Sequence, residues 1–575
     1  MKFYLGWKKI PAPFIRYSEI FILTLIGTSY LYFVLNPWYG PAVGYEEVIE
    51  DGIRLIDFLK TKQTDAFFEL TFGDIELPLY TSNAYNGALD FYLLIPFFLL
   101  LGKNLFAVRF MMVCFGLLMM LFLYLFLKKY FNRSVAFYTL LLLLFQPCYV
   151  LFSKMLFSNA TLNLLMIASL YFYSRYSETG NGRHSYILSF LCGLGLWRKL
   201  TFVSFLLGLL LLHFFLLRDD KQRPFRNTLK MILSFFLGAW PFFLYNILSG
   251  GGTVRTILIS LINSNQVHGK LGYNNLSILE NIRARVTQFL NFFGGYDFDW
   301  VHPLNSPGIR TFFGPVFLLS LAYLLFKSVF KKNWKYRGET VSVLFLFLFI
   351  FLAMIYSPTA ARVINLYFLI PFPQIIIALF FYDSLHLIRR GAALFPELGR
   401  AAFLRALLAP SLLLIYLMPN YRIINWINSP EYQPYWTSSA KEILELGPYI
   451  RKHSIDEILV LDKGLIATTF IKLITYSATQ PVVFWEEARR DQQLDFALYS
   501  PELLEDNFRN YLSSKKEFYL FEYAYQTYHG TEKVYFDAFK KNLSLFPHKV
   551  LSREEFRDQK GRLLFTLSKI AISRP

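Results

Sequence analysis

The sequence predicts an all-α polytopic membrane domain followed by a smaller α/β domain outside the membrane. Hydrophobic residues make up 55% of the 575 residues and charged residues only 17%, whereas a soluble globular protein carries about 25% charged residues. Apolar runs long enough to cross a bilayer recur up to residue 419 and then stop. The net charge of +18 is typical of a membrane protein with basic cytoplasmic loops, so nucleic acid is not expected as a partner.

The apolar runs predict about eleven membrane-spanning helices. A span needs about 20 mostly apolar residues, because the hydrocarbon core is about 30 Å thick. The predicted spans are residues 17–36, 104–127, 134–152, 157–174, 185–198, 200–217, 229–248, 311–330, 341–357, 363–384 and 402–419. The first span follows basic residues and no clear cleavage site comes after it, which indicates an uncleaved signal anchor.

The basic residues between the spans predict the orientation. With the N-terminus in the cytoplasm, every predicted inner loop is basic, as the positive-inside rule requires. These loops contain Lys128, Lys129, Arg133, Arg218, Lys221, Arg223, Arg226, Lys230, Lys327, Lys331, Lys332, Lys335, Arg337, Arg389, Arg390, Arg400 and Arg405. We therefore expect an integral membrane protein, in the plasma or inner membrane of a bacterial cell, with a membrane domain over residues 1–419.

Three parts of the chain are then expected on the outer side. They are the loops 37–103 and 249–310 and the soluble extracytoplasmic α/β domain 420–575. The apolar stretch Leu89–Leu101 is short for a span, so we expect it in the membrane interface, with Tyr92 at the headgroup level.

The C-terminal domain is predicted from alternating strand and helix patterns. The strands are expected at residues 458–462, 481–485, 518–522 and 563–572, with helices at 439–452 and 500–514. No glycine fingerprint follows any of these strands, so nucleotide binding is not predicted.

Glu46 and Glu47 form a carboxylate pair directly after the first span. Such a pair can serve as a general base or as a metal ligand. It can also simply begin a helix, because acids favour the first turn and apolar residues recur at helical spacing from Val48 to Ile56. The three cysteines lie apart in apolar runs and predict no metal site. No cofactor is expected with certainty, although a divalent cation is compatible with the pair.

Four cations stand on the predicted outer side, against the positive-inside trend. They are Lys154, Arg198, Lys199 and Arg362. Together they can form a site for an anionic group at the membrane surface, and both residue types bind phosphate. The alternative is that each side chain snorkels to lipid headgroups.

These features together resemble the GT-C glycosyltransferases of the protein O-mannosyltransferase and aminoarabinose-transferase type, the glycosyltransferase 39 group. The resemblance covers about residues 15–385, and the first acid here is Glu where the family usually has Asp. Its motifs are Glu46-Glu47-Val48, Tyr85-Asn86-Gly87-Ala88 with Tyr92 and Pro96, Gly102-Lys103-Asn104 through Arg109, Gly193-Leu194-Gly195 through Lys199, and Arg362 with Pro371-Phe372-Pro373.

The resemblance implies transfer of a sugar from a polyprenyl-phosphate donor to an acceptor that the sequence does not identify. It implies that Glu46 or Glu47 is the base, and that the outer cations hold the donor phosphate. Tyr85, Asn86 and Tyr92 would line the substrate site, and membrane lipid surrounds it. Two other classes remain open, namely a transporter or flippase of lipid-linked sugars and a non-catalytic GT-C relative that binds lipid.

Overall fold

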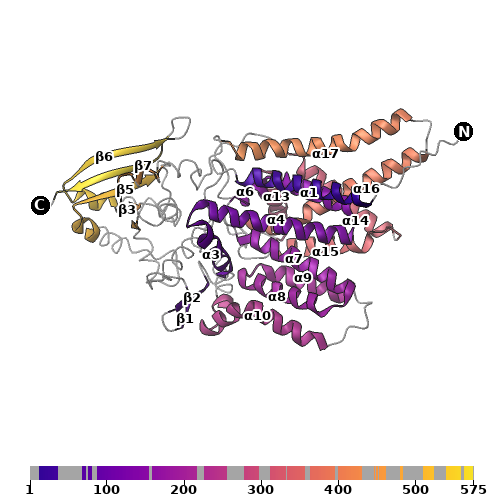
Figure 1. Ribbon diagram of the computed structural model, residues 1–575, viewed down its shortest axis with the longest axis horizontal. Helices are drawn as coiled ribbons and strands as arrows, with labels where there is room; N and C mark the ends of the chain where they lie inside the picture. Colours follow the sequence, from indigo (N-terminus) through magenta and orange to yellow (C-terminus); the bar gives the residue numbers. More distant parts are fainter. Residues whose placement is uncertain are drawn as a thin grey trace.

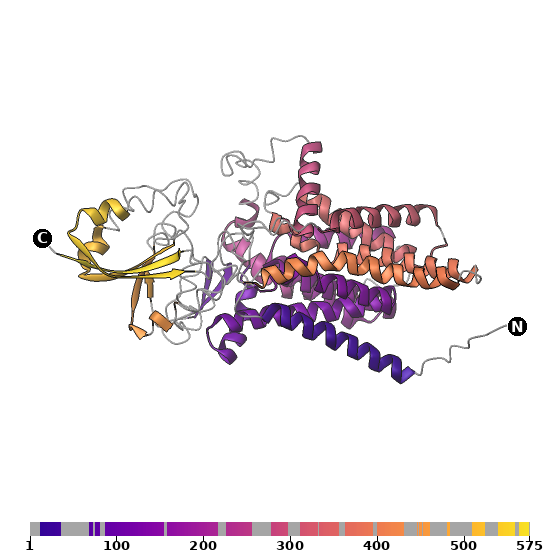
Figure 2. The ribbon, with the colours of Figure 1, turned by 90° about the horizontal axis from the view of Figure 1, so that it is seen from above.

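The computed structural model shows a bundle of long helices with a β-sheet at one end and the N-terminus at the other (Figures 1 and 2). We call the two ends of the bundle the sheet end and the opposite end. The structure describes residues 12–35, 68–72, 75–80, 87–154, 158–216, 226–255, 278–296, 311–331, 333–355, 363–394, 399–429, 446, 448–450, 452–460, 480–482, 509–523, 539–557 and 563–573.

Helices are present at all the predicted spans, although their bounds differ. The bundle helices are α1 (Ala12–Leu35), α4 (Leu105–Tyr130), α5 (Arg133–Leu144), α6 (Pro147–Phe152), α7 (Ser158–Thr179), α8 (Gly182–Arg198), α9 (Phe202–Leu211), α10 (Arg226–Leu248), α14 (Phe313–Phe330), α15 (Arg337–Ile355), α16 (Phe372–Leu394) and α17 (Gly399–Ile427). A π-helical turn, Leu212–Leu216, continues α9.

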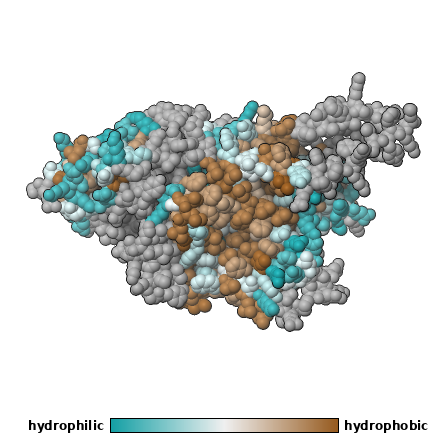
Figure 3. Space-filling view, in the orientation of Figure 1, coloured by the Kyte–Doolittle hydropathy of each residue, from teal (hydrophilic) through white to brown (hydrophobic). Residues whose placement is uncertain are grey.

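Five of the described helices, which lie in α1, α4, α10, α14 and α15, are long and apolar enough to cross a membrane. The predicted total of about eleven stays a prediction. Figure 3 shows hydrophobic residues gathered over the middle of the bundle, with more hydrophilic residues toward both ends. This distribution suits a domain that a bilayer surrounds.

Two predicted spans are wrong in detail because proline interrupts them. The span expected at 134–152 is divided at Phe145 and Gln146, and Pro147 occupies the first turn of α6. Proline is accepted in the first turn of a helix but removes a hydrogen bond from a helix interior. The span expected at 363–384 begins as a 3₁₀ helix, η5 (Val363–Leu369), and the α-helix starts only after Pro371.

The packing of α8 against α10 explains part of the glycine-rich segment. A Cβ atom on Gly193 would lie 2.2 Å from the carbonyl oxygen of Phe235, and one on Gly238 would lie 2.3 Å from that of Phe190. The two backbones therefore touch at a pair of glycines, as small residues allow in membrane helices. This contact fixes α8, whose last turn leads to the candidate site.

Carboxylates at the opposite end of the bundle are paired with basic side chains. Glu19 of α1 accepts hydrogen bonds from Tyr124 and Lys128 of α4. Asp383 of α16 accepts from Tyr323 and Lys327 of α14 in the same way. Since an isolated charge is costly inside a membrane domain, these pairs tie neighbouring helices together at that end.

The C-terminal region contains a five-stranded mixed sheet in the order β4-β3-β5-β7-β6. Its strands are β3 (Glu457–Val460), β4 (Gln480–Val482), β5 (Glu517–Tyr523), β6 (His548–Arg557) and β7 (Leu563–Ile572). β3 pairs in parallel with β4 and β5, whereas β7 is antiparallel to β5 and β6. The sequence missed β6, because its side chains are mostly exposed and polar and lack a clear apolar alternation.

Three further elements were not predicted as they are found. A hairpin, β1 (Phe68–Phe72) and β2 (Ile75–Tyr80), lies in the first loop that was expected on the outer side, and α13 (Ile278–Gly294) lies in the second. The stretch expected in the interface forms helix α3 (Leu89–Leu101). Figure 1 shows α3 lying across the sheet end of the bundle, beside the start of α4.

Candidate functional site

Several basic side chains among the described residues are buried at the sheet end of the bundle. Arg198 and Lys199 lie at the end of α8, Lys154 follows α6, and Arg109 lies in the second turn of α4. Their exposed fractions are 0%, 3%, 0% and 2%, respectively. Buried cations at membrane depth are costly, so they are functional candidates by default.

Lys199 is held by neutral partners. Its Nζ donates to the side-chain oxygen of Asn159 at 3.1 Å and to that of Asn365 at 3.2 Å. These asparagines come from α7 and η5, two elements far apart in the sequence. Amide oxygens accept hydrogen bonds from an ammonium group and orient it, and they carry no formal charge of their own. These two hydrogen bonds fix the direction of the Lys199 side chain.

Arg109 and Lys154 add positive charge to the same end. The two groups are close enough for their charges to repel. Lys154 was predicted as a candidate, whereas Arg109 was quoted only as the last residue of a motif. The signal that could have found Arg109 is its depth, because it stands five residues into an apolar span.

Arg198 faces a carboxylate. Its Nη2 lies 2.6 Å from Oδ2 of Asp90, and its Nη1 donates to the carbonyl oxygen of Gly87 at 3.0 Å. Asp90 is 1% exposed and belongs to the first turn of α3. Sequence reasoning missed Asp90, although a single acid within an apolar stretch is itself a signal. A phosphate-binding role for Arg198 stays a prediction.

The remaining predicted residues are placed only in part. Tyr92 lies in α3, and its ring centroid is 5.9 Å from that of Trp197 in the last turn of α8. Glu46, Glu47, Tyr85, Asn86 and Arg362 lie outside the described residues. Within the described part of the chain, no group of three or more His, Cys, Asp and Glu residues could hold a metal ion.

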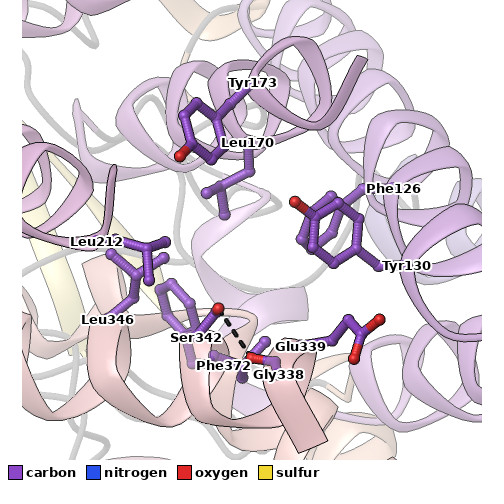
Figure 4. A pocket seen from close by; sticks show the side chains of 11 residues that line it. Phe126, Tyr130, Leu170, Tyr173, Leu212, Gly338, Glu339, Ser342, Leu346 and Phe372 are labelled. Atoms are coloured by element: carbon purple, nitrogen blue, oxygen red, sulfur yellow. Dashed lines mark hydrogen bonds between the residues drawn. The ribbon is translucent and has the colours of Figure 1, made fainter. Parts of the chain in front are cut away.

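A cavity of about 300 Å³ lies away from these cations, between the ends of α4 and α7 and the start of α15. Figure 4 shows that mostly apolar and aromatic side chains line it, with Glu339 as its one acid and no basic residue. It therefore contributes nothing to an anion site.

Comparisons with known proteins identify the fold of this chain. Residues 88–245 match the model of the dolichyl-phosphate-mannose-protein mannosyltransferase family. No curated protein matches the sequence. Solved structures share the fold, and the GT-C resemblance predicted from the sequence is confirmed.

Two proteins represent these solved structures. ArnT from Cupriavidus metallidurans, bound to undecaprenyl phosphate, is 11% identical with a TM-score of 0.54, over 95% of this chain and 97% of that chain. The Archaeoglobus fulgidus oligosaccharyltransferase in its apo form is 12% identical with a TM-score of 0.54, over 96% and 74%. The same archaeal protein, AglB, is also known with an inhibitory peptide and a dolichol-phosphate, at 12% identity and a TM-score of 0.53. The chain thus has the fold of the GT-C glycosyltransferases.

Proposed function

We propose that this protein is a membrane glycosyltransferase that moves a sugar from a polyprenyl-phosphate donor to an acceptor hydroxyl on the outer face of the membrane. The observation that carries the proposal is the set of buried cations at the sheet end, above all Lys199 with its two neutral amide partners. A group of buried positive charges attracts an anion, and a phosphate at the end of a lipid brings one to this depth. Polyprenyl phosphates bound by the fold relatives support this choice.

The reaction follows from these charges. Glu46 removes the proton from the acceptor hydroxyl, with Glu47 as its helper or as the base itself. The freed oxygen forms a bond to the anomeric carbon, and the bond from that carbon to the phosphate oxygen breaks. The polyprenyl phosphate leaves with the electron pair, and the configuration at the anomeric carbon is inverted. Lys199 and Lys154 stabilise the negative charge that develops on the leaving phosphate.

The other predicted residues take supporting roles in this proposal. Arg362 stands three residues before Asn365, one of the two partners of Lys199, and is assigned to the phosphate. Tyr85, Asn86 and Tyr92 line the substrate site. The C-terminal sheet belongs to an extracytoplasmic accessory domain, and the N-terminus is cytoplasmic.

Native mass spectrometry tests the proposal on the full chain, extracted gently from its own membranes. We expect the wild type to retain polyprenyl phosphate or its glycosylated form, and Arg362→Ala to lose it. The mass of the retained donor would identify the sugar class directly. If both proteins carry only bulk phospholipid, the cations are satisfied by headgroups and the glycosyltransferase proposal is wrong.

A further inference from the structure

Hydrogen bonds join the end of α8 to the chain segment that leads into α3. Gly87 donates its backbone N–H to the carbonyl oxygen of Arg198 at 3.0 Å, and the Arg198 side chain returns a bond to the Gly87 carbonyl. Trp197 donates its ring Nε1 to the carbonyl oxygen of Leu79 at 3.1 Å. The ion pair between Arg198 and Asp90 closes this set of contacts.

These contacts leave little room for movement. A Cβ atom on Gly87 would lie 2.0 Å from the backbone oxygen of Trp197, so only glycine fits between the two segments. Asp90 and Arg198 are both almost fully buried. Separating a buried ion pair is unfavourable, because leaving either partner alone carries a desolvation cost.

Lys199 directly follows this last turn of α8. It caps α8 with an extended backbone at φ −162°, and its N–H donates to the carbonyl oxygen of Gly195. Arg198 is the last residue of the helix and Lys199 has an extended backbone, so the two side chains leave the chain in different directions. Arg198 accordingly reaches α3, while Lys199 reaches Asn159 and Asn365 on other elements.

We propose that Asp90 and Arg198 form a positioning pair that fixes the backbone at Lys199, so that the Lys199 ammonium meets the phosphate of the lipid donor. This inference rests on the proposed function and assigns Arg198 to positioning instead of phosphate binding. The pair suits positioning because the negative charge of Asp90 compensates Arg198 and would repel an anion placed beside it. The Lys199 ammonium, by contrast, is oriented by the amide oxygens of Asn159 and Asn365.

The variant Asp90→Asn separates the two roles by the sign of its effect. Removing a negative charge near the site strengthens anion binding if electrostatics alone matter or if Arg198 is released to bind phosphate. A positioning role predicts the reverse, namely affinity for undecaprenyl phosphate at least about tenfold weaker, because Lys199 is no longer held in place. Titration of undecaprenyl phosphate into the full chain in lipid nanodiscs measures this. Unchanged or tighter binding would overturn the inference.

A double-mutant cycle with Lys199→Met distinguishes positioning from a general structural defect. If Asp90 acts through Lys199, adding Asp90→Asn to Lys199→Met weakens binding by less than about threefold further. Additive losses would overturn the inference. Arg198→Lys serves as a milder variant if Asp90→Asn does not fold, since it keeps the charge but not the fork that also reaches Gly87, and it is judged by the same cycle.

Asp383→Asn is the matched control, because Asp383 is also a paired carboxylate in the bundle but contacts α14 at the opposite end. Its affinity for undecaprenyl phosphate should equal that of the wild type. Measurements on the wild type distinguish failure of the proposed function from failure of the positioning pair alone. If the wild type binds undecaprenyl phosphate no better than undecaprenol, the proposed function fails. If it prefers the phosphate and Asp90→Asn has no effect, only the positioning pair fails.

Discussion

Glu46→Gln or Glu47→Gln should slow sugar transfer by about 10²- to 10⁴-fold while the lipid donor still binds. Glutamine has nearly the shape of glutamate but cannot accept a proton, and loss of a positioned general base has effects of this size. The variant with the larger loss identifies the base. Transfer is measured as release of polyprenyl phosphate from its glycosylated form, using the donor recovered from the protein's own membranes.

Binding of undecaprenyl phosphate is the control for these two variants. It should change little, because the carboxylates act on the acceptor and not on the phosphate. Full transfer activity in both variants would rule out the base assignment. If a variant loses undecaprenyl phosphate binding and shows no additional loss of transfer, the two glutamates instead maintain the structure of the loop that contains them.

Lys199→Met should weaken the binding of undecaprenyl phosphate by about 100-fold. Loss of one partner of a buried, hydrogen-bonded charge pair costs about 2–5 kcal/mol, and each 1.4 kcal/mol or so is a factor of about ten in affinity. Methionine keeps the volume and the unbranched shape of the lysine stem. The affinity is measured by titration into the full chain in lipid nanodiscs.

Lys331→Met is the matched control, since Lys331 is an exposed lysine after α14, at the opposite end of the bundle. Its affinity for undecaprenyl phosphate should be that of the wild type. Equal losses in both variants would mean that lysines act only through the overall charge of the protein. No loss in Lys199→Met would remove Lys199 from the site.

Hydrophobic patterning predicted the bundle well where a span is continuous. The span expected at 229–248 is found as α10, Arg226–Leu248. Prediction failed at Pro147, where an apolar run of sufficient length is broken by one residue. Apolar content decides whether a segment enters the membrane, whereas a single proline decides whether it remains one helix.

Some residues of the candidate site were predictable from the sequence, but their contacts were not. Basic residues on the predicted outer side go against the positive-inside trend, and this observation identified Lys154, Arg198 and Lys199. The partners of these residues depend on tertiary packing, and no spacing in the sequence connects Arg198 with Asp90, or Lys199 with Asn365. Adjacent cations therefore received one predicted role, although the fold gives them different partners.

The most direct test of the central claim compares undecaprenyl phosphate with undecaprenol of the same chain length. Both are titrated into the wild-type full chain in lipid nanodiscs at fixed ionic strength. Because the buried cations recognise phosphate, the account predicts that the phosphate binds at least about 100-fold more tightly, corresponding to about 2.7 kcal/mol or more. Equal affinity for the two lipids would contradict it, since the site would then recognise only the hydrocarbon chain.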